Sequence, residues 1–144
     1  MLNHDAPAYR FVTAAADLEP IAAALAREQV LGVDLEADSM YHFREKVCLV
    51  QVAAPGRAVV IDPLQGADLT LLAPVLADPG IRKVMHGADY DIRSLFRDFR
   101  MEIHNLFDTE MAARFLGLKE SGLEAVLRIH LGVELDNRLQ RKDC

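Results

Sequence analysis

The sequence predicts an α/β fold in which helices flank a mixed β-sheet. Two observations lead to this prediction. Three short apolar runs rich in valine, leucine and isoleucine follow one another, as in an antiparallel meander of three strands. After them, segments with helical periodicity alternate with short strand-like runs. With 144 residues, 51% of them hydrophobic, the chain is large enough to bury one core, and we expect residues 1–144 to form a single domain.

The first half of the chain is expected to contain one helix followed by three strands. The helix is predicted over residues 17–28, with Asp17 as its N-cap, because apolar residues recur there at three- and four-residue spacing. Pro55 and Gly56 mark the turn between the second and third strands. The strands are predicted at residues 30–37, 47–53 and 57–61. The first ten and the last ten residues are candidate linkers.

The second half is expected to alternate between helices and strands. The most regular stretch is 89–99, where four apolar residues share one helical face: Ile92, Leu95, Phe96 and Phe99. Asp108 is a predicted N-cap, and Ser121 and Glu124 have the spacing of a capping box. The last helix has a predicted buried stripe of Leu123, Val126, Leu127 and Leu131. Helices are expected over residues 69–76, 89–99, 109–116 and from Ser121 to Gly132, and strands over residues 81–85 and 103–107.

Charge and cysteine content exclude several classes of protein. A net charge of −6 argues against a module that grips nucleic acid by neutralising phosphates with a basic surface. A metal-dependent nuclease is compatible with that charge, because acidic residues would serve as ligands and the bound cations would reverse the local field. Cys48 and Cys144 have no metal-ligand or redox spacing. We expect no membrane segment and a cytoplasmic location, because no long apolar run or signal peptide is evident.

Asp34 and Glu36 form the most informative pair of residues. They lie two apart at the end of an apolar run, so in a strand both carboxylates project from the same face. Like charges on a partly buried surface are tolerated when they share a proton, meet cationic side chains or bind metal ions. We favour metal; the alternative is a pair of ordinary ion pairs to Arg44, Lys46 or Arg93.

A further acidic cluster follows the strand predicted at residues 81–85. Asp91 lies at the edge of the apolar stripe of the next helix and can face the sheet, whereas Asp89 can face solvent. Asp91 is therefore the better ligand candidate, although an acid in the first helical turn is also favoured by the helix dipole alone. His86 is expected to be a hydrogen-bonded histidine and Tyr90 a packing residue. Three carboxylates provide most of a two-metal phosphodiesterase site.

Four segments together resemble the ribonuclease D branch of the DEDD 3'-5' exonucleases. They are Asp34-x-Glu36, HGADYDI at residues 86–92, NLFDT at residues 105–109 and LDNRLQRKD at residues 135–143. The resemblance runs from about Val30 to the end of the chain. It implies a ribonuclease H-like fold and hydrolysis of nucleotides from the 3' end of RNA or single-stranded DNA, with two Mg²⁺ or Mn²⁺ ions.

The resemblance also implies a role for each carboxylate. Asp34 would bridge both ions, Glu36 would bind the ion that activates the attacking water, and Asp91 would help to hold the second ion through water. The family's third motif supplies a tyrosine and an aspartate shortly after the segment that the tail resembles. This chain ends at Cys144, before them, so we expect a domain truncated at its C-terminus with weakened metal binding.

Substrate contacts are predicted beside the acidic pair. His42, Phe43 and Arg44 combine an aromatic ring with a basic side chain, which can stack a terminal base and hold a phosphate. By resemblance, these residues and Leu35 line the path of the 3' end; an ordinary solvated loop is the alternative. Two other functions remain open, namely a catalytically inactive nucleic-acid-binding or partner-binding remnant, and an unrelated α/β interaction domain.

Overall fold

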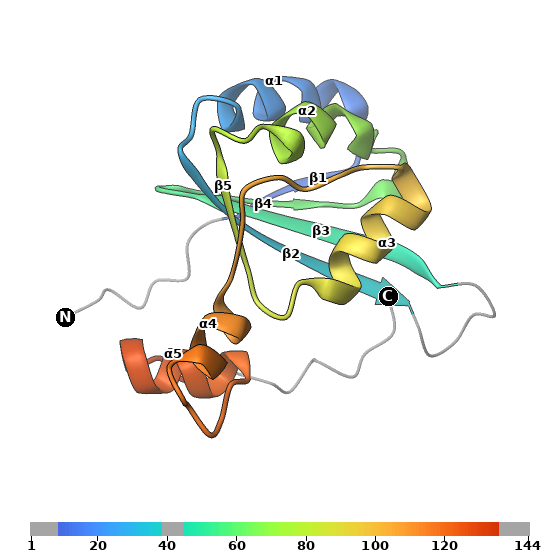
Figure 1. Ribbon diagram of the computed structural model, residues 1–144. Helices are drawn as coiled ribbons and strands as arrows, with labels where there is room; N and C mark the ends of the chain where they lie inside the picture. The colour runs from blue at the N-terminus through green and yellow to red at the C-terminus, as the bar shows by residue number, and fades with distance from the viewer. Residues whose placement is uncertain (1–8, 39–44, 136–144) are drawn as a thin grey trace.

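The computed structural model describes residues 9–38 and 45–135, which form a six-stranded sheet in the order β1-β4-β3-β2-β5-β6 (Figure 1). The long β2 and β3 and the shorter β4 form the predicted antiparallel meander. The other neighbours, β1 with β4, β2 with β5, and β5 with β6, are parallel, so the sheet is mixed as expected. The strands are β1 Tyr9–Val12, β2 Val30–Asp38, β3 Lys46–Ala54, β4 Arg57–Ile61, β5 Arg82–Met85 and β6 Leu106–Asp108.

Helices connect the parallel strands. Figure 1 shows α1 and α2 together above the sheet, with α4 and α5 at the opposite end of the molecule. The α-helices are α1 Ala15–Leu25, α2 Ala73–Ala77, α3 Asp89–Phe99, α4 Thr109–Phe115 and α5 Leu123–Leu131, and the 3₁₀ turns are Pro63–Gln65 and Leu69–Leu72. None of these helices exceeds eleven residues, and within the described ranges none has the length and apolar character needed to cross a bilayer.

The core lies on one face of the sheet because side chains alternate along β2. Leu31, Val33 and Leu35 are buried, while Asp34 and Glu36 between and beyond them are exposed on the other face. Buried residues of β3, β4, α1, α2 and α3 complete the core, among them Val50, Val52, Ile61, Leu18, Leu25, Leu76 and Leu95. Burial of each of these leucine side chains stabilises the folded state by roughly 1.5–3 kcal/mol. The packed face thus fixes β2 and leaves its acidic face available.

Two N-terminal expectations were wrong. Residues predicted as linker include β1, an edge strand that pairs with β4 from Tyr9 opposite Ala58 onward. Only its last residue, Val12, is buried, so the alternation that marks a strand is missing from the sequence. The helix α1 starts two residues earlier than predicted, after Ala14, and Asp17 lies in its first turn and pairs with Arg10 at 3.1 Å instead of capping.

The structure also differs from the predictions at residues 69–76, expected as a helix, and at residues 103–107, expected as a strand. The helix is divided into a 3₁₀ turn and α2, because Pro74 near the start of α2 has no N–H to donate to a continuous ladder. The strand β6 starts three residues later than predicted. Before it, His104 N donates to Leu76 O at 3.0 Å and Asn105 adopts a φ of 55°, which is not extended backbone.

The last helix departs most from expectation. Its N-cap is Gly122 without a side-chain cap, so the predicted capping box is wrong. The hydroxyl of Ser121 donates to Glu110 Oε1 at 3.3 Å instead. The predicted buried stripe is half-buried at Val126 and Leu127, and its ends are exposed, since Leu123 is 41% and Leu131 60% accessible. Within the described part of the chain, α5 packs mainly on α4.

We expect Leu25→Ala to lower the free energy of unfolding by about 2–5 kcal/mol, because the side chain is fully buried and its truncation leaves a cavity. Urea denaturation followed by circular dichroism measures the change. Leu64→Ala is the control, since Leu64 is 57% exposed and its truncation should change stability by less than about 0.5 kcal/mol. Equal losses in the two variants would contradict the placement of the core.

Candidate active site

The acidic pair lies on the open face of the central strand β2. Asp34 is opposite Gln51 and Glu36 opposite Leu49 on β3, and a register shift follows Glu36. Burial raises the pKa of both carboxyls, although the side chains remain accessible, because the surrounding protein displaces part of their water. The charge of Asp34 raises the pKa of Glu36 further. The two carboxylates therefore lie on the same face of β2, as predicted, and their role as metal ligands stays a prediction.

Asp91 joins this site from another element. It is half-buried in the first turn of α3, and its pKa rises to about 7 through burial and then through the charges of Asp34, Glu36 and Asp108. This repulsion shows that the three predicted ligands gather at one place, whereas Asp89 faces solvent and pairs with Arg93 at 2.6 Å.

The turn between β5 and α3 is held by Asp108. Its carboxylate accepts hydrogen bonds from Gly87 N at 3.0 Å and Ala88 N at 2.8 Å, and also from Glu110 N and Met111 N at the start of α4. Burial raises the pKa of Asp108, but these four donors outweigh it, so the pKa lies below the ordinary value. The predicted N-cap is confirmed, and it also fixes the first turn of α3.

Gly87 allows this turn to form. Its φ is +66°, in the left-handed region, and a Cβ there would lie 2.8 Å from Glu110 Oε2. A side chain at this position would therefore be strained by its backbone and would also push aside the carboxylate of Glu110. The placement of Asp91 thus depends on a glycine that lies four residues before it.

His86 is hydrogen-bonded, as predicted, through one of its two nitrogens. Its Nδ1 lies 2.9 Å from Thr109 Oγ1, and the Thr109 hydroxyl lies 3.0 Å from Met85 O. The other nitrogen, Nε2, is buried and has no hydrogen-bond partner within the described residues. No local sequence pattern indicates that Nε2 is buried without a hydrogen-bond partner.

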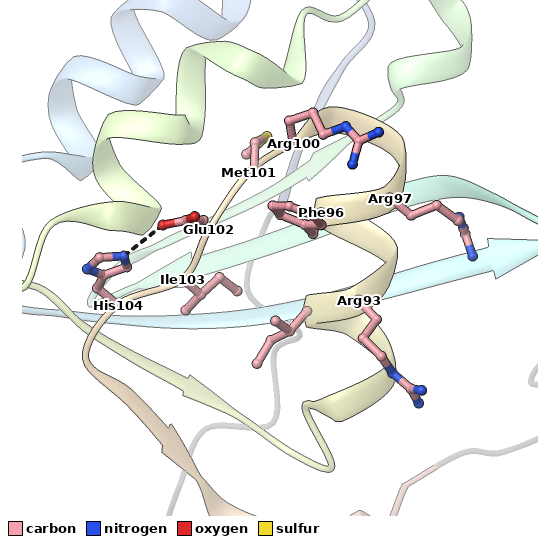
Figure 2. Close-up of a pocket in the computed structure, with 9 residues that line it drawn as sticks. Arg93, Phe96, Arg97, Arg100, Met101, Glu102, Ile103 and His104 are labelled. Carbon is pink, nitrogen blue, oxygen red and sulfur yellow. Dashed lines mark hydrogen bonds and ion pairs between the residues drawn. The ribbon is translucent and has the colours of Figure 1, made fainter.

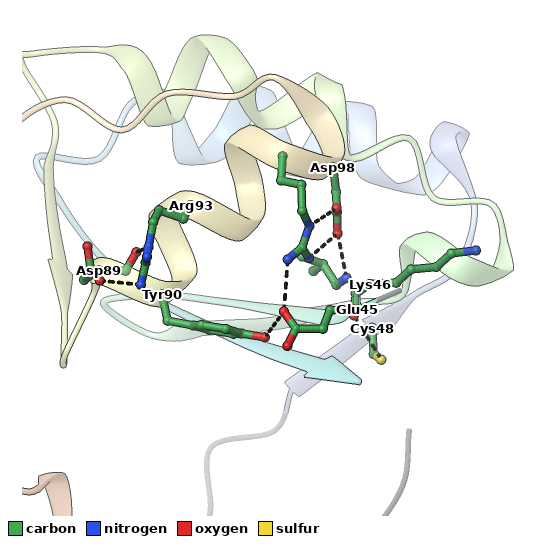
Figure 3. A network of polar contacts seen from close by, with 9 residues as sticks. Glu45, Lys46, Cys48, Asp89, Tyr90, Arg93 and Asp98 are labelled. Atoms are coloured by element: carbon green, nitrogen blue, oxygen red, sulfur yellow. Dashed lines mark hydrogen bonds and ion pairs between the residues drawn. The ribbon is translucent and has the colours of Figure 1, made fainter. Parts of the chain in front are cut away.

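A polar network joins α3 to the start of β3 (Figure 3). The Tyr90 hydroxyl donates to Glu45 Oε2 at 2.9 Å, so Tyr90 has a specific polar role in addition to the predicted packing. Arg97 binds both Glu45 at 3.1 Å and Asp98 at 2.7 Å, and Asp98 accepts a hydrogen bond from Val47 N at 2.9 Å. These contacts fix Glu45, the first described residue after the gap at 39–44.

Among the described residues, the basic side chains proposed as alternative partners do not pair with Asp34 or Glu36. Arg93 pairs with Asp89, and Lys46 makes no ion pair with Asp34 or Glu36 among the described residues. Arg44 lies outside the described residues, as do His42 and Phe43, so their predicted substrate contacts stay predictions. Leu35 is 8% exposed and packs in the core, which leaves its backbone as the part nearest to the acidic face.

The other flank of α3 carries a groove in which apolar side chains, Ile92, Phe96, Met101 and Ile103, are accompanied by charged and polar ones, Arg93, Arg97, Arg100, Glu102 and His104 (Figure 2). Arg100 covers the Phe96 ring at 5.3 Å from its centroid, which is a cation–π contact. The groove is separate from the acidic site, since Asp34, Glu36 and Asp91 do not line it. Among the described residues, no three acidic, histidine or cysteine side chains already enclose a point where an ion could be held.

Comparison with known proteins decides the family. The family model described as "3'-5' exonuclease" matches residues 9–144. The catalytic core of RRP6 from Trypanosoma brucei superposes with a TM-score of 0.92 at 34% identity, covering 99% of this chain and 40% of that one. The chain belongs to the 3'-5' exonuclease family, in its ribonuclease D-like branch.

Two further relatives agree. The rat protein "Exosome complex component 10" is 40% identical over 116 residues, which is 80% of this chain and 13% of that protein. Escherichia coli RNase D, described as an exoribonuclease involved in structured RNA processing, has a TM-score of 0.86 at 25% identity over 94% of this chain and 36% of its own. This chain therefore spans less than half the length of each of these relatives. The structural matches confirm the predicted ribonuclease H-like fold.

Removal of the Asp108 carboxylate is expected to loosen both helix starts. Asp108→Ala leaves four backbone N–H groups without their acceptor and should lower stability by about 1–3 kcal/mol at pH 7. Because the folded pKa is depressed, the contribution of Asp108 is present above its unfolded pKa and is lost as pH falls through the lower folded value. Denaturation of both proteins between pH 7 and pH 3 measures this.

The matched control is Asp68→Ala, which removes an exposed carboxylate that caps one backbone N–H of a 3₁₀ turn at 3.1 Å. It should reduce stability by less than the Asp108 variant at pH 7. The difference between wild type and Asp108→Ala should shrink as the pH falls below about 4. A difference that does not change with pH would contradict the assignment.

The repulsion at Asp91 predicts a stabilising substitution. A carboxyl whose folded pKa is raised opposes folding as pH rises from about 4 to about 7, because ionisation is harder in the folded state. Asp91→Asn should therefore raise the melting temperature in EDTA by about 2–5 °C at pH 8 and by little at pH 4; the shift is small because solvent screens this half-buried group. Asp89→Asn, which alters a solvent-facing acid of the same turn, should not stabilise the protein at pH 8.

Proposed function

We propose that this domain removes nucleotides from the 3' end of RNA or single-stranded DNA by metal-dependent hydrolysis. The observation that supports this best is the gathering of Asp34, Glu36 and Asp91 at the open face of the sheet, close enough for the charge of Asp34 to raise the pKa values of Glu36 and Asp91. Membership of the exonuclease family gives the same reaction class. Asp34 and Glu36 lie on an accessible face of the sheet, which suits a polymer substrate.

The donor set suits Mg²⁺ or Mn²⁺. All three side chains offer carboxylate oxygens, which hard divalent cations prefer, and their mutual repulsion is relieved when a cation is bound. Two bound cations would supply positive charge for the attacking and leaving oxygens of the phosphodiester. We propose that Asp34, whose charge acts on both Glu36 and Asp91, would contribute to both cation positions. Protonation of Asp91 competes with the cation, so metal affinity should rise with pH through about 7.

RNA is the substrate class that the relatives favour. One relative is described as an exoribonuclease and another as an exosome component. For this domain we propose contacts to the terminal nucleotide from the backbone of Leu35 and from His42, Phe43 and Arg44, the last three of which directly precede Glu45. A cytoplasmic location stays a prediction from the sequence.

A second candidate is binding without hydrolysis. It is favoured by the lack of a closed ion site among the described residues, which fits a protein that keeps the acidic face but needs further groups to hold cations firmly. Both candidates predict binding of a single-stranded 3' end, and they differ in whether Mn²⁺ leads to cleavage.

Digestion of single-stranded RNA labelled at either end tests the proposal. With Mn²⁺, 5'-labelled RNA should shorten stepwise while 3'-labelled RNA releases labelled mononucleotide at once. Asp34→Ala should lower the rate about 100-fold or more, because it removes a ligand shared by both cation positions. Asp89→Asn serves as the matched control and should retain the rate. If RNA is bound but not shortened at high protein concentration, hydrolysis by this chain is excluded and binding alone remains.

A further inference from the structure

The sheet places His86 beside Asp34. In the parallel pair of β2 and β5, Gly32 is opposite Val84. Asp34 lies two residues beyond Gly32 in β2, and His86 lies two residues beyond Val84, directly after the last residue of β5. The alternation of the strands therefore brings both side chains to the face that carries the acids. Neighbouring strands are about 4.8 Å apart, so the imidazole is a neighbour of the carboxylate. Its proximity also shows in the pKa of Asp34, which burial raises and which the Leu35 N–H and His86 lower in part.

The hydrogen bond at Nδ1 fixes which nitrogen carries the proton. The Thr109 hydroxyl has one hydrogen, and the carbonyl oxygen of Met85 at 3.0 Å can only accept it. The Thr109 oxygen must then accept from His86 Nδ1 at 2.9 Å. In the neutral imidazole, Nδ1 is therefore the donor and Nε2 is an acceptor with a free lone pair.

That lone pair has no donor within the described residues, although Nε2 is buried. A buried polar atom without a partner is unfavourable by about 1–3 kcal/mol, and such atoms usually have a water or ligand partner. The carboxylate of Asp34 cannot supply one, because it is itself an acceptor. A water molecule has two hydrogens and can donate one to Nε2 and one to a carboxylate oxygen.

We propose that His86 is a positioning residue of the exonuclease site, whose Nε2 accepts a hydrogen bond from a water molecule bound at Asp34. This inference rests on the proposed function, since the water is one that a cation at Asp34 would carry. Thr109 sets the tautomer and His86 sets the orientation of the water. An outer partner of this kind typically changes metal affinity 10- to 100-fold.

Two amide variants separate the two nitrogens of His86. His86→Asn places an amide near the position of Nδ1 and can keep the bond to Thr109, but it has no atom at the position of Nε2. His86→Gln extends to that position and can offer its amide oxygen to the water. Mn²⁺ affinity of the metal-free chain at pH 8, measured by isothermal titration calorimetry, should fall about 10-fold in His86→Asn and less than about 3-fold in His86→Gln. Thr109→Val should also reduce Mn²⁺ affinity, because without the Thr109 hydroxyl the proton of the neutral imidazole is no longer held on Nδ1.

Controls distinguish failure of this inference from failure of the proposed function. Asp34→Asn should abolish Mn²⁺ binding, and a wild-type chain that binds no Mn²⁺ would overturn both. Wild-type binding with unchanged affinity in His86→Asn would overturn the role of His86 alone. If His86 were only structural, melting temperatures would fall in both amide variants while the Mn²⁺ affinity of the folded protein stayed equal. A loss in His86→Asn that His86→Gln restores supports the positioning role.

Discussion

The site depends on the carboxylate of Asp108 more than on any other single group. It accepts hydrogen bonds from four backbone N–H groups, two in the turn after β5 and two at the start of α4. These segments are about twenty residues apart in sequence, so one half-buried carboxylate joins the ends of two parallel strands and orients two helices. Asp91 faces the sheet because this turn is fixed. Residues without any contact to substrate can therefore set the geometry of a reaction.

The acidic face is maintained against its own electrostatics. Asp34 and Glu36 are held by a strand whose other face is packed in the core, so they cannot separate without disrupting Val33 and Leu35. The raised pKa of Asp91 measures the resulting repulsion. Repulsion of this kind, kept on an accessible face of the sheet, is an expected compromise between stability and function.

Polar contacts of α3 relate this site to the segment proposed to hold substrate. Tyr90 and Arg97 both bind Glu45, and Asp98 accepts a hydrogen bond from the backbone N–H of Val47 in β3 (Figure 3). The helix that carries Asp91 thus also fixes the residue that directly follows Arg44. The groove on the other flank of α3 shares no residue with the acidic cluster of Asp34, Glu36 and Asp91.

The sequence by itself determined the meander, the amphipathic α3, the acidic pair on one strand face, the cap at Asp108 and the family. All of these follow from local spacing, which the chain carries within a few residues. Tertiary structure decided the second pair of hydrogen bonds at Asp108, the unsatisfied nitrogen of His86 and the pairing of β1. It also decided that Leu123 and Leu131 are exposed. The physical reason is that hydrogen bonds and burial join residues twenty to fifty positions apart, and no local pattern records which distant partner a side chain will meet.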